Sequence, residues 1–288
     1  MEKIMRIAAA LLSACALALS APVAAQAPAA AHHHAAHPAL AEVLASPIRD
    51  GDRARDRWRN PAETLTFFGV EPGMTVVDFM PSGGWFSRIL IPYLGAEGTY
   101  IGLNPNVGES GGPGFFQSMR NTADNFPGQA AGWVPQGGAR VIGANIGSVP
   151  QELNGTVDRV MIMREIHNIR RFGWFHDLAV TLRAMLKDDG LVGVEQHRAP
   201  ADAPASYVLG DNGYQREQDV IALFEAYGFE LVARSNINAN PADPAIWERG
   251  VWSLPPSFAG APEGSEERAR RAQIGESDRM TLLFRKRP

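Results

Sequence analysis

The chain has 288 residues and a formal net charge of −4; hydrophobic residues make up 45% of it and charged residues 20%. This composition is that of a globular protein and excludes a collagen-like, coiled-coil or largely disordered chain. The absence of a basic stripe argues against nucleic acid as a partner, and a single cysteine excludes both a disulfide framework and a cysteine-ligated zinc site.

The start of the chain follows the pattern of a secretory signal peptide. Lys3 and Arg6 give a basic start, residues 7–21 are almost entirely apolar, and small residues follow up to Ala27. The apolar run of about 15 residues is short for a membrane span. We therefore predict a signal peptide over residues 1–25, export to the periplasm or beyond, and a mature chain without a transmembrane helix.

A second interpretation of the leader is a lipoprotein box ending at Cys15. Leu12–Cys15 matches such a box, and lipidation of the cysteine would tether the protein to a membrane. We favour simple cleavage because the chain stays apolar over residues 16–25, where a lipoprotein usually turns polar.

The segment after the leader, residues 26–45, is rich in Ala and Pro and is predicted to be a linker. It contains four histidines between His32 and His37, and imidazole is the commonest ligand of zinc, copper and nickel. Incidental metal binding by a flexible linker is the interpretation that we favour. The remaining residues, 46–288, are predicted to form one domain.

From residue 46 onward the sequence predicts helices and strands in alternation. Asn60 and Pro61 are the N-cap and first residue of an expected helix that Gly69 ends. The other predicted elements are strands 74–79, 99–103, 139–144, 157–163, 191–195, 229–232 and 280–284, and helices 85–94, 115–125, 172–186 and 217–227. This alternation predicts a parallel sheet with helices on both faces, which binds ligands outside the carboxyl ends of its strands.

One segment departs from the alternation. Residues 238–277 contain five prolines and no predicted helix or strand. A segment of about 40 residues without regular structure usually has a function or packs as a lid. We expect part of it to cover a pocket, with Trp252 and Leu254 facing inward.

The loop after the first predicted strand is a candidate cofactor site. Asp78 lies near the end of that strand, and Pro81, Gly83 and Gly84 precede the next helix. Glycine lets a ligand approach the backbone closely, and a helix N-terminus offers unpaired N–H groups. Asp78 could bind a cation or orient the loop. A tight connection between strand and helix is the alternative interpretation.

Several motifs resemble those of the class I S-adenosylmethionine-dependent methyltransferases, above all a bacterial family of exported predicted methyltransferases with an Asp-x-x-Pro-Gly-Gly-Gly-Trp loop. Residues 78–85 are similar to that loop. Residues 164–168 resemble the family's Arg-Asn-x-His-Asn segment, and further similar segments are 213–216, 250–256 and 275–280. The resemblance implies a Rossmann-like class I methyltransferase fold with a mostly parallel seven-stranded sheet.

The resemblance also implies a function and the residues that serve it. The cofactor would be S-adenosylmethionine, and the methyl acceptor a small molecule. The implied cofactor-binding residues are Asp78, Pro81, Gly83, Gly84, Asn104, Asn145 and Arg164. The implied catalytic residues, which would face the acceptor, are His167, Tyr214 and Arg216.

Four positions depart from the methyltransferase patterns. The usual loop has glycine at the positions of Met80 and Ser82, and within the exported family Ser82 replaces a glycine. Asn104 ends the second predicted strand, where an acid usually binds the ribose hydroxyls, and Asn145 stands where an aspartate often contacts adenine. Hydrogen bonds to a carboxylate are about twice as strong as those between neutral groups, so we expect these amides to weaken cofactor binding.

Glu165 and His167 stand two residues apart after the fourth predicted strand, as do Glu195 and His197 at the end of the fifth. On extended backbone such pairs face the same way, and the family pattern makes the two strands neighbours. The four groups could act as acids and bases, hold a divalent metal, or pair with nearby arginines as structural residues. We favour acid–base chemistry without a metal, with His167 as general base at a pKa near 6.5, raised further if Glu165 lies close.

Three functions fit these motifs. The favoured function is S-adenosylmethionine-dependent methyl transfer to an unidentified small-molecule acceptor. The second is an exported ligand-binding protein without enzymatic activity, suggested by the leader and by the asparagines that replace acids. The third is a metal-dependent hydrolase or isomerase that uses the strand-end cluster. The sequence leaves the acceptor and the oligomeric state open.

Overall fold

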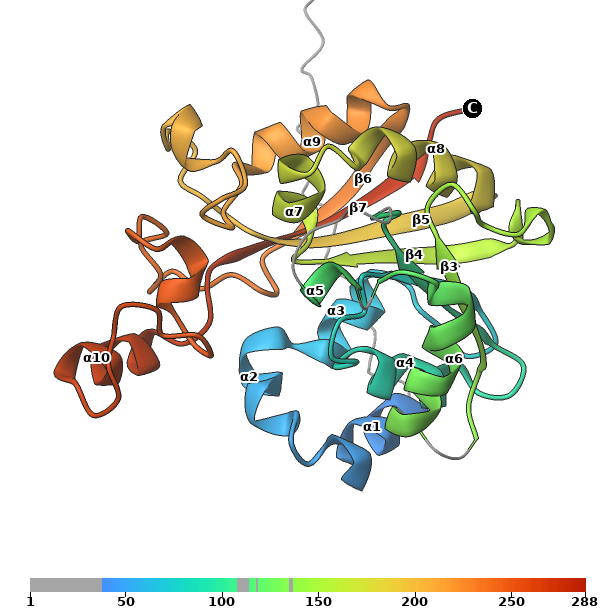
Figure 1. Ribbon diagram of the computed structural model, residues 1–288, viewed down its shortest axis with the longest axis horizontal. Coiled ribbons are helices and arrows are strands. Elements are labelled where there is room, and N and C mark those ends of the chain that lie inside the picture. Colours follow the sequence, from blue (N-terminus) through green and yellow to red (C-terminus); the bar gives the residue numbers. More distant parts are fainter. Residues whose placement is uncertain (1–37, 108–113, 118, 135–136) are drawn as a thin grey trace, which may run out of the picture. The chain divides into compact units, whose positions relative to one another are not determined.

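The computed structural model describes residues 38–107, 114–117, 119–134 and 137–288 (Figure 1). The predictions of a signal peptide, of lipidation at Cys15 and of metal binding at His32–His37 fall outside these residues. Within these ranges, no helix is both long enough and apolar enough to cross a membrane.

A seven-stranded sheet lies at the centre of the described domain. Its strands are β1 (Thr75–Phe79), β2 (Thr99–Asn104), β3 (Arg140–Asn145), β4 (Val157–Met163), β5 (Leu186–His197), β6 (Phe229–Ser235) and β7 (Arg279–Lys286). Their order is β3-β2-β1-β4-β5-β7-β6, and of these strands β7 alone runs antiparallel to its neighbours. All seven strands were predicted from the sequence.

Helices cover both faces of the sheet (Figure 1). One side carries α3 (Pro61–Phe67), α4 (Ser87–Leu94) and α6 (Thr122–Trp133), with α1 (Pro38–Ala45) packed on α3 and α4; the other carries α7 (Ile166–Arg171), α8 (Phe175–Met185) and α9 (Glu217–Ala226). Adjacent residues of a strand point to opposite faces, so Val76 and Val77 are both fully buried but pack in different cores. The predicted class I methyltransferase fold is confirmed.

The predicted set of helices needs correction at three points. The helix expected over 115–125 is two helices, α5 (Gly114–Gln117) and α6, separated by Asn121 in a left-handed conformation. The short helices α2 (Asp56–Arg59) and α7 were not predicted. The long segment 238–277, expected to lack regular structure, contains α10 (Glu266–Ile274). This helix was missed because it has no apolar stripe; ion pairs of Glu267 with Arg270 and Arg271 stabilise it instead.

Asn60 starts α3 but does not cap it. Its φ of 39° is left-handed, and no side-chain cap bond forms. The side-chain amide donates instead to the carbonyl oxygen of Ile237, at 2.8 Å. Asn60 therefore links the start of α3 to the distant segment that follows β6.

The linker predicted for residues 26–45 is too long at its carboxyl end. Residues Pro38–Ala45 form α1, and Leu40 is only 1% exposed. Val43 and Leu44 lie on the same helical face and pack against the same core cluster. The Ala-rich composition that suggested a linker also favours a helix, and these three apolar side chains attach that helix to the domain.

Replacing Leu40 tests whether α1 belongs to the core. The Leu40→Ala variant is expected to lower the free energy of unfolding by about 2–5 kcal/mol, because it leaves a cavity in the core. Urea denaturation measures the loss. The control is Glu42→Ala at an exposed position of the same helix, which should change stability by less than about 0.5 kcal/mol. Equal stabilities of the two variants would contradict the packing of α1 in the core and would support the prediction that residues 38–45 belong to the linker.

Candidate functional site

A cavity of about 280 Å³ lies at the carboxyl ends of β1 and β4, and we call it the switch-point cavity. The chain proceeds from β1 through β2 to β3 on one side of the sheet, and from β4 to β5 on the other. Such a reversal leaves a crevice at which open α/β sheets bind their ligands. The charged side chains that line this cavity are Asp52, Arg55, Arg59, Asp78, Arg88, Arg164 and Glu165.

The loop between β1 and α4 forms one wall of this cavity. Met80 and Ser82 have left-handed φ angles of 53° and 51°, although neither is glycine. These are the two positions at which the usual methyltransferase loop has glycine. A residue other than glycine in this backbone conformation raises the free energy of the folded state by on the order of 1–3 kcal/mol, and such strain is concentrated at ligand sites.

The two predicted cofactor glycines have different surroundings. Gly83 lines the cavity, and a Cβ atom built on it would meet nothing within 4 Å. Gly84 has a φ of 73°, and a Cβ atom there would lie 2.5 Å from the ring of Trp133. Gly83 is therefore the glycine that leaves room for a ligand. Gly84 instead allows the loop to pack on α6, and its contact with a cofactor stays a prediction.

Alanine substitutions separate the roles of the two glycines. Gly84→Ala is expected to lower the free energy of unfolding by at least about 1–3 kcal/mol, because the methyl group meets Trp133 and the left-handed conformation becomes strained. Gly83→Ala adds a methyl group to open space and should leave stability within about 0.5 kcal/mol. Chemical denaturation of both variants measures the difference. A Gly84→Ala protein as stable as Gly83→Ala would contradict the packing role.

A second cavity, of about 250 Å³, shares Pro81, Ser82 and Gly83 with the first. We call it the Asn104 cavity; its other lining residues are Asn104, Met119, Phe126 and Gln129. Asn104 is 7% exposed at the end of β2, and its amide donates to the hydroxyl of Thr122 at 3.2 Å. The two cavities together place charged groups on one side of the glycine loop and neutral amides with apolar side chains on the other.

Asn145 lies outside both of these cavities. Its Nδ2 atom donates to the carbonyl oxygens of Met119 at 2.7 Å and Pro105 at 3.0 Å, and its Oδ1 atom accepts from the backbone N–H of Thr122 at 3.0 Å. Asn145 thereby holds in place the connection that carries Met119 into the Asn104 cavity. Its direct contact with a cofactor stays a prediction.

Buried ion pairs form the base of the switch-point cavity. Glu276 accepts from Nε of Arg55 at 2.5 Å and from Nε of Arg59 at 3.2 Å, and it also pairs with Arg279 at 3.1 Å. Burial alone would raise the pKa of Glu276, but Arg59, Arg279 and Arg55 lower that pKa to about 2. Burial, together with the neighbouring charge of Arg164, lowers the pKa of Arg59 to about 9.

Asp78 and Glu165 face the same cavity from β1 and from the end of β4. The Tyr100 hydroxyl donates to Asp78 Oδ2 at 2.8 Å, and the Asn168 amide donates to Glu165 Oε2 at 2.8 Å. Burial raises the pKa of each carboxyl group to about 7; the respective hydrogen bonds and the charge of Arg164 oppose this shift. Both groups can therefore hold or release a proton near neutral pH.

The sequence did not predict Arg55 or Arg59 as site residues, and it placed Glu165 in the strand-end cluster and not among the cofactor-binding residues. The two arginines come from a segment that precedes the first predicted element, so no motif marked them. Glu165 carried a signal, because it replaces the first asparagine of the family's Arg-Asn-x-His-Asn segment. Arg164 was predicted and lines the cavity; its guanidinium also pairs with Glu195 at 3.1 Å.

The three predicted catalytic residues do not line the switch-point cavity. His167 lies on α7 and is 5% exposed. Tyr214 is fully buried, and its hydroxyl donates to Asp243 Oδ2 at 2.8 Å. Arg216 donates to the carboxylate of Asp219 at 2.8 Å. None of the three residues therefore lies in this cavity, and their role toward an acceptor stays a prediction.

His167 and His197 lie close together on α7 and at the end of β5. Their ring centroids are 5.8 Å apart, the ring of Trp252 lies 5.9 Å from His167, and Ser277 Oγ lies 2.6 Å from His197 Nδ1. Burial lowers the pKa of His167 to about 4 and that of His197 well below its usual value. The pKa near 6.5 or higher expected for a His167 base is thus wrong.

The strand-end cluster does not form as predicted. Arg164 has a left-handed φ of 63°, Glu165 is the N-cap of α7 with a ψ of −6°, and His167 lies within that helix, so Glu165 and His167 are not on extended backbone. In the described parts of the chain, no group of three His, Cys, Asp or Glu side chains could hold a metal ion. These four residues therefore do not form a three-ligand group in the described structure.

The long segment 238–277 packs inward in part, as predicted. Leu254 is fully buried, and Trp252 lies against His167. Neither side chain lines the switch-point cavity or the Asn104 cavity. The segment therefore covers the two histidines, and its expected role as the lid of the ligand pocket is not supported at Trp252 and Leu254.

The neutral state of His167 makes stability depend on pH. Between pH 6.5 and about 4 the unfolded chain binds a proton at this residue and the folded chain does not, so stability falls as the pH falls through this range. The full effect is roughly 3 kcal/mol. In His167→Gln that part of the slope should disappear when free energies of unfolding are measured across the range. His176→Gln, at an exposed position on α8, is the control and should keep the wild-type slope; an unchanged slope in His167→Gln would contradict the assignment.

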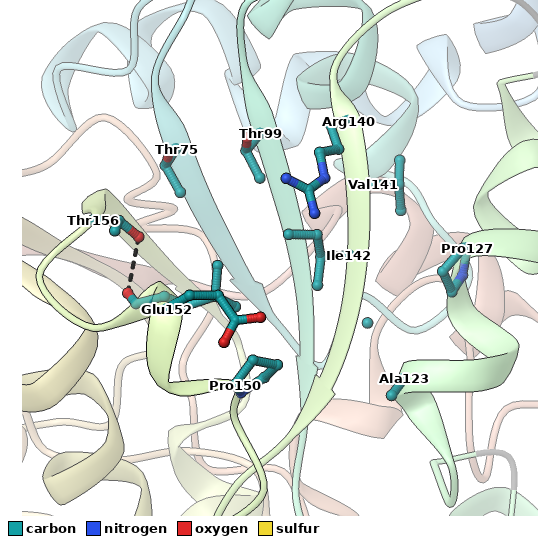
Figure 2. Close-up of a pocket in the computed structure, with 12 residues that line it drawn as sticks. Thr75, Thr99, Ala123, Pro127, Arg140, Val141, Ile142, Pro150, Glu152 and Thr156 are labelled. Atoms are coloured by element: carbon teal, nitrogen blue, oxygen red, sulfur yellow. Dashed lines mark hydrogen bonds between the residues drawn. The ribbon is translucent and has the colours of Figure 1, made fainter.

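A larger cavity, of about 660 Å³, lies at the amino ends of the strands (Figure 2). Figure 2 shows Thr75, Thr99 and Arg140 at the starts of β1, β2 and β3, with Glu152 beside them. A single short turn, η3 (Gln151–Leu153), follows β3 before β4 begins. This cavity lies at the amino ends of these strands, where α/β sheets of this type do not usually bind ligands, so we do not take it as the candidate site.

No protein-family model and no curated protein matches the chain. Similar solved structures include a SAM dependent methyltransferase from Aquifex aeolicus, with 15% identity, 69% of this chain and 93% of the other covered, and a TM-score of 0.47. The PH0226 protein from Pyrococcus horikoshii has 11% identity, 84% and 94% coverage, and a TM-score of 0.45. A TehB-like SAM-dependent methyltransferase from Corynebacterium glutamicum has 16% identity, 84% and 100% coverage, and a TM-score of 0.39. The class I methyltransferase fold is recognised from the strand order β3-β2-β1-β4-β5-β7-β6 with β7 antiparallel, and not from these similarities.

Proposed function

We propose that this protein binds S-adenosylmethionine across the glycine loop and transfers its methyl group to a small-molecule acceptor. The observation that carries the proposal is the pair of cavities that share Pro81, Ser82 and Gly83. One is charged and the other is largely neutral, as the two ends of this cofactor require. The fold places both at the edge of the sheet where ligands bind.

The residues of the switch-point cavity fit an amino-acid group that carries both a carboxylate and an ammonium. Glu276 accepts from the Nε atoms of Arg55 and Arg59, which leaves their terminal nitrogens to donate to a ligand carboxylate. Asp78 and Glu165 offer carboxyl oxygens to an ammonium. Arg59 is held in place by its guanidinium lying 4.7 Å from the ring centroid of Trp85.

The Asn104 cavity fits a nucleoside. Asn104 and Gln129 provide amides that can bind ribose hydroxyls or base edges, and Met119 and Phe126 provide apolar surface for a purine. Because no carboxylate lines this cavity, hydrogen bonds to the ribose lack charge assistance. The proposal therefore includes moderate cofactor affinity.

When bound, the cofactor supplies an electrophilic methyl group on a positively charged sulfur. The protein contributes positioning and electrostatics, which is the main catalytic requirement of such a displacement. Gly83 gives access along the loop, and Arg55 and Arg59 orient the amino-acid end. Asp78 and Glu165 are the groups of the cavity able to accept a proton, because burial holds the pKa of each near 7.

Replacing Gly83 with valine tests the shared loop. The Cβ atom of a valine at this position meets nothing within 4 Å, and its methyl groups would occupy the space that the two cavities share, so binding of S-adenosylhomocysteine should become undetectable by calorimetry while the protein stays folded. The matched control is Gly132→Val on α6, where an added side chain also meets open space and binding should be retained. Wild-type protein that binds S-adenosylhomocysteine no better than 5′-methylthioadenosine, which lacks the amino-acid end, would contradict the role of the switch-point cavity.

A further inference from the structure

The carboxyl groups at the switch-point cavity are of two kinds. Asp52 forms a two-bond ion pair with Arg88, at 2.6 and 2.8 Å. Asp78 and Glu165 differ, because the groups that donate to them are the neutral hydroxyl of Tyr100 and the neutral amide of Asn168. Of the described residues that line the cavity, these are the two carboxyl groups without a hydrogen-bonded arginine.

We propose that Asp78 and Glu165 together recognise positive charge on the ligand and make the cavity bind the methyl donor more tightly than the demethylated product. The proposal rests on the proposed function. S-adenosylmethionine carries two cationic groups, the α-ammonium and the sulfonium, whereas S-adenosylhomocysteine carries the ammonium alone. Two carboxylates therefore balance both positive charges of the donor. With the product, one of the two carboxylates has no positive charge to balance it.

The other charged groups of the cavity are already paired and cannot take over the recognition of a positive charge from Asp78 and Glu165. Arg55 and Arg59 are paired with Glu276, Arg164 with Glu195, and Arg88 with Asp52. The charge of Arg164 lowers the pKa of both carboxyl groups and so partly favours their charged forms, and the charge of Asp78 raises the pKa of Glu165. In the ligand-free cavity each of the two carboxyl groups is therefore partly protonated near neutral pH.

If the two carboxyl groups recognise a cation, binding should release a proton, and this release can be measured. With the pKa of each group near 7, the empty pair holds about one proton at pH 7. A bound cation favours the charged carboxylate and expels that proton. Donor affinity should therefore rise as the pH rises from 6 to 8, and the product should show a smaller rise because it brings one positive charge fewer.

Isothermal titration calorimetry with both ligands tests the inference. At pH 7, titrations in MOPS and in imidazole buffer should show release of about one proton with S-adenosylmethionine and clearly less with S-adenosylhomocysteine. At pH 8 the donor should bind about tenfold more tightly than the product. At pH 5.5, where the pair is largely protonated, this preference should fall below about threefold.

Glu165→Gln removes one charge and keeps an oxygen that can accept from Asn168. The variant should lose most of the preference for the donor at pH 8, because its affinity for S-adenosylmethionine falls by more than its affinity for S-adenosylhomocysteine. Asp78→Asn provides a second variant with the same expected direction. The control is Glu152→Gln in the cavity at the amino ends of the strands, which should keep the wild-type preference.

The outcomes separate the two proposals. Equal affinities of wild-type protein for the two ligands, without proton release, would overturn the charge recognition and leave the proposed function standing. Equal losses of affinity for both ligands in Glu165→Gln would also overturn it, because the carboxylate would then recognise only the shared ammonium. Absence of binding of either ligand to the wild type would overturn the proposed function itself.

Discussion

Two buried glutamates, Glu195 and Glu276, hold together the walls of the switch-point cavity. Glu276 pairs with Arg55 and Arg59 from the segment before β1, and Arg279 at the start of β7 pairs with both glutamates, at 3.1 Å each. Removing one member of a buried ion pair costs roughly 3–5 kcal/mol, because a charge is left without its partner. The segments that carry these residues are therefore fixed relative to one another. The arginines that face the ligand owe their positions to this network.

The glycine loop adds a second constraint. Met80 and Ser82 adopt left-handed backbone conformations, and Gly84 closes the loop against Trp133. This geometry leaves Gly83 exposed between a charged cavity and a neutral one. The charged side is determined by long-range ion pairs and the neutral side by the ends of β2 and α6. The proposed cofactor position thus follows from two independent features of the fold, the ion-pair network and the strained loop.

The sheet could be predicted from the sequence because strands buried on both faces are continuous apolar runs, as in β1 and β4. The glycine loop could be predicted because its position after such a strand is recognisable. The network could not, since Arg59 and Glu276 are 217 residues apart and leave no local pattern. The position of His167 could not be predicted, because the spacing argument assumed extended backbone, whereas α7 begins at Ile166 and His167 is buried within that helix.

A crystal structure of the protein with S-adenosylhomocysteine tests the central claim most directly. The account predicts electron density for the amino-acid end beside Arg59 and Glu165, and for the nucleoside beside Asn104, with the thioether crossing the backbone at Gly83. Density in the cavity between Arg140 and Glu152, or on the surface, would contradict it.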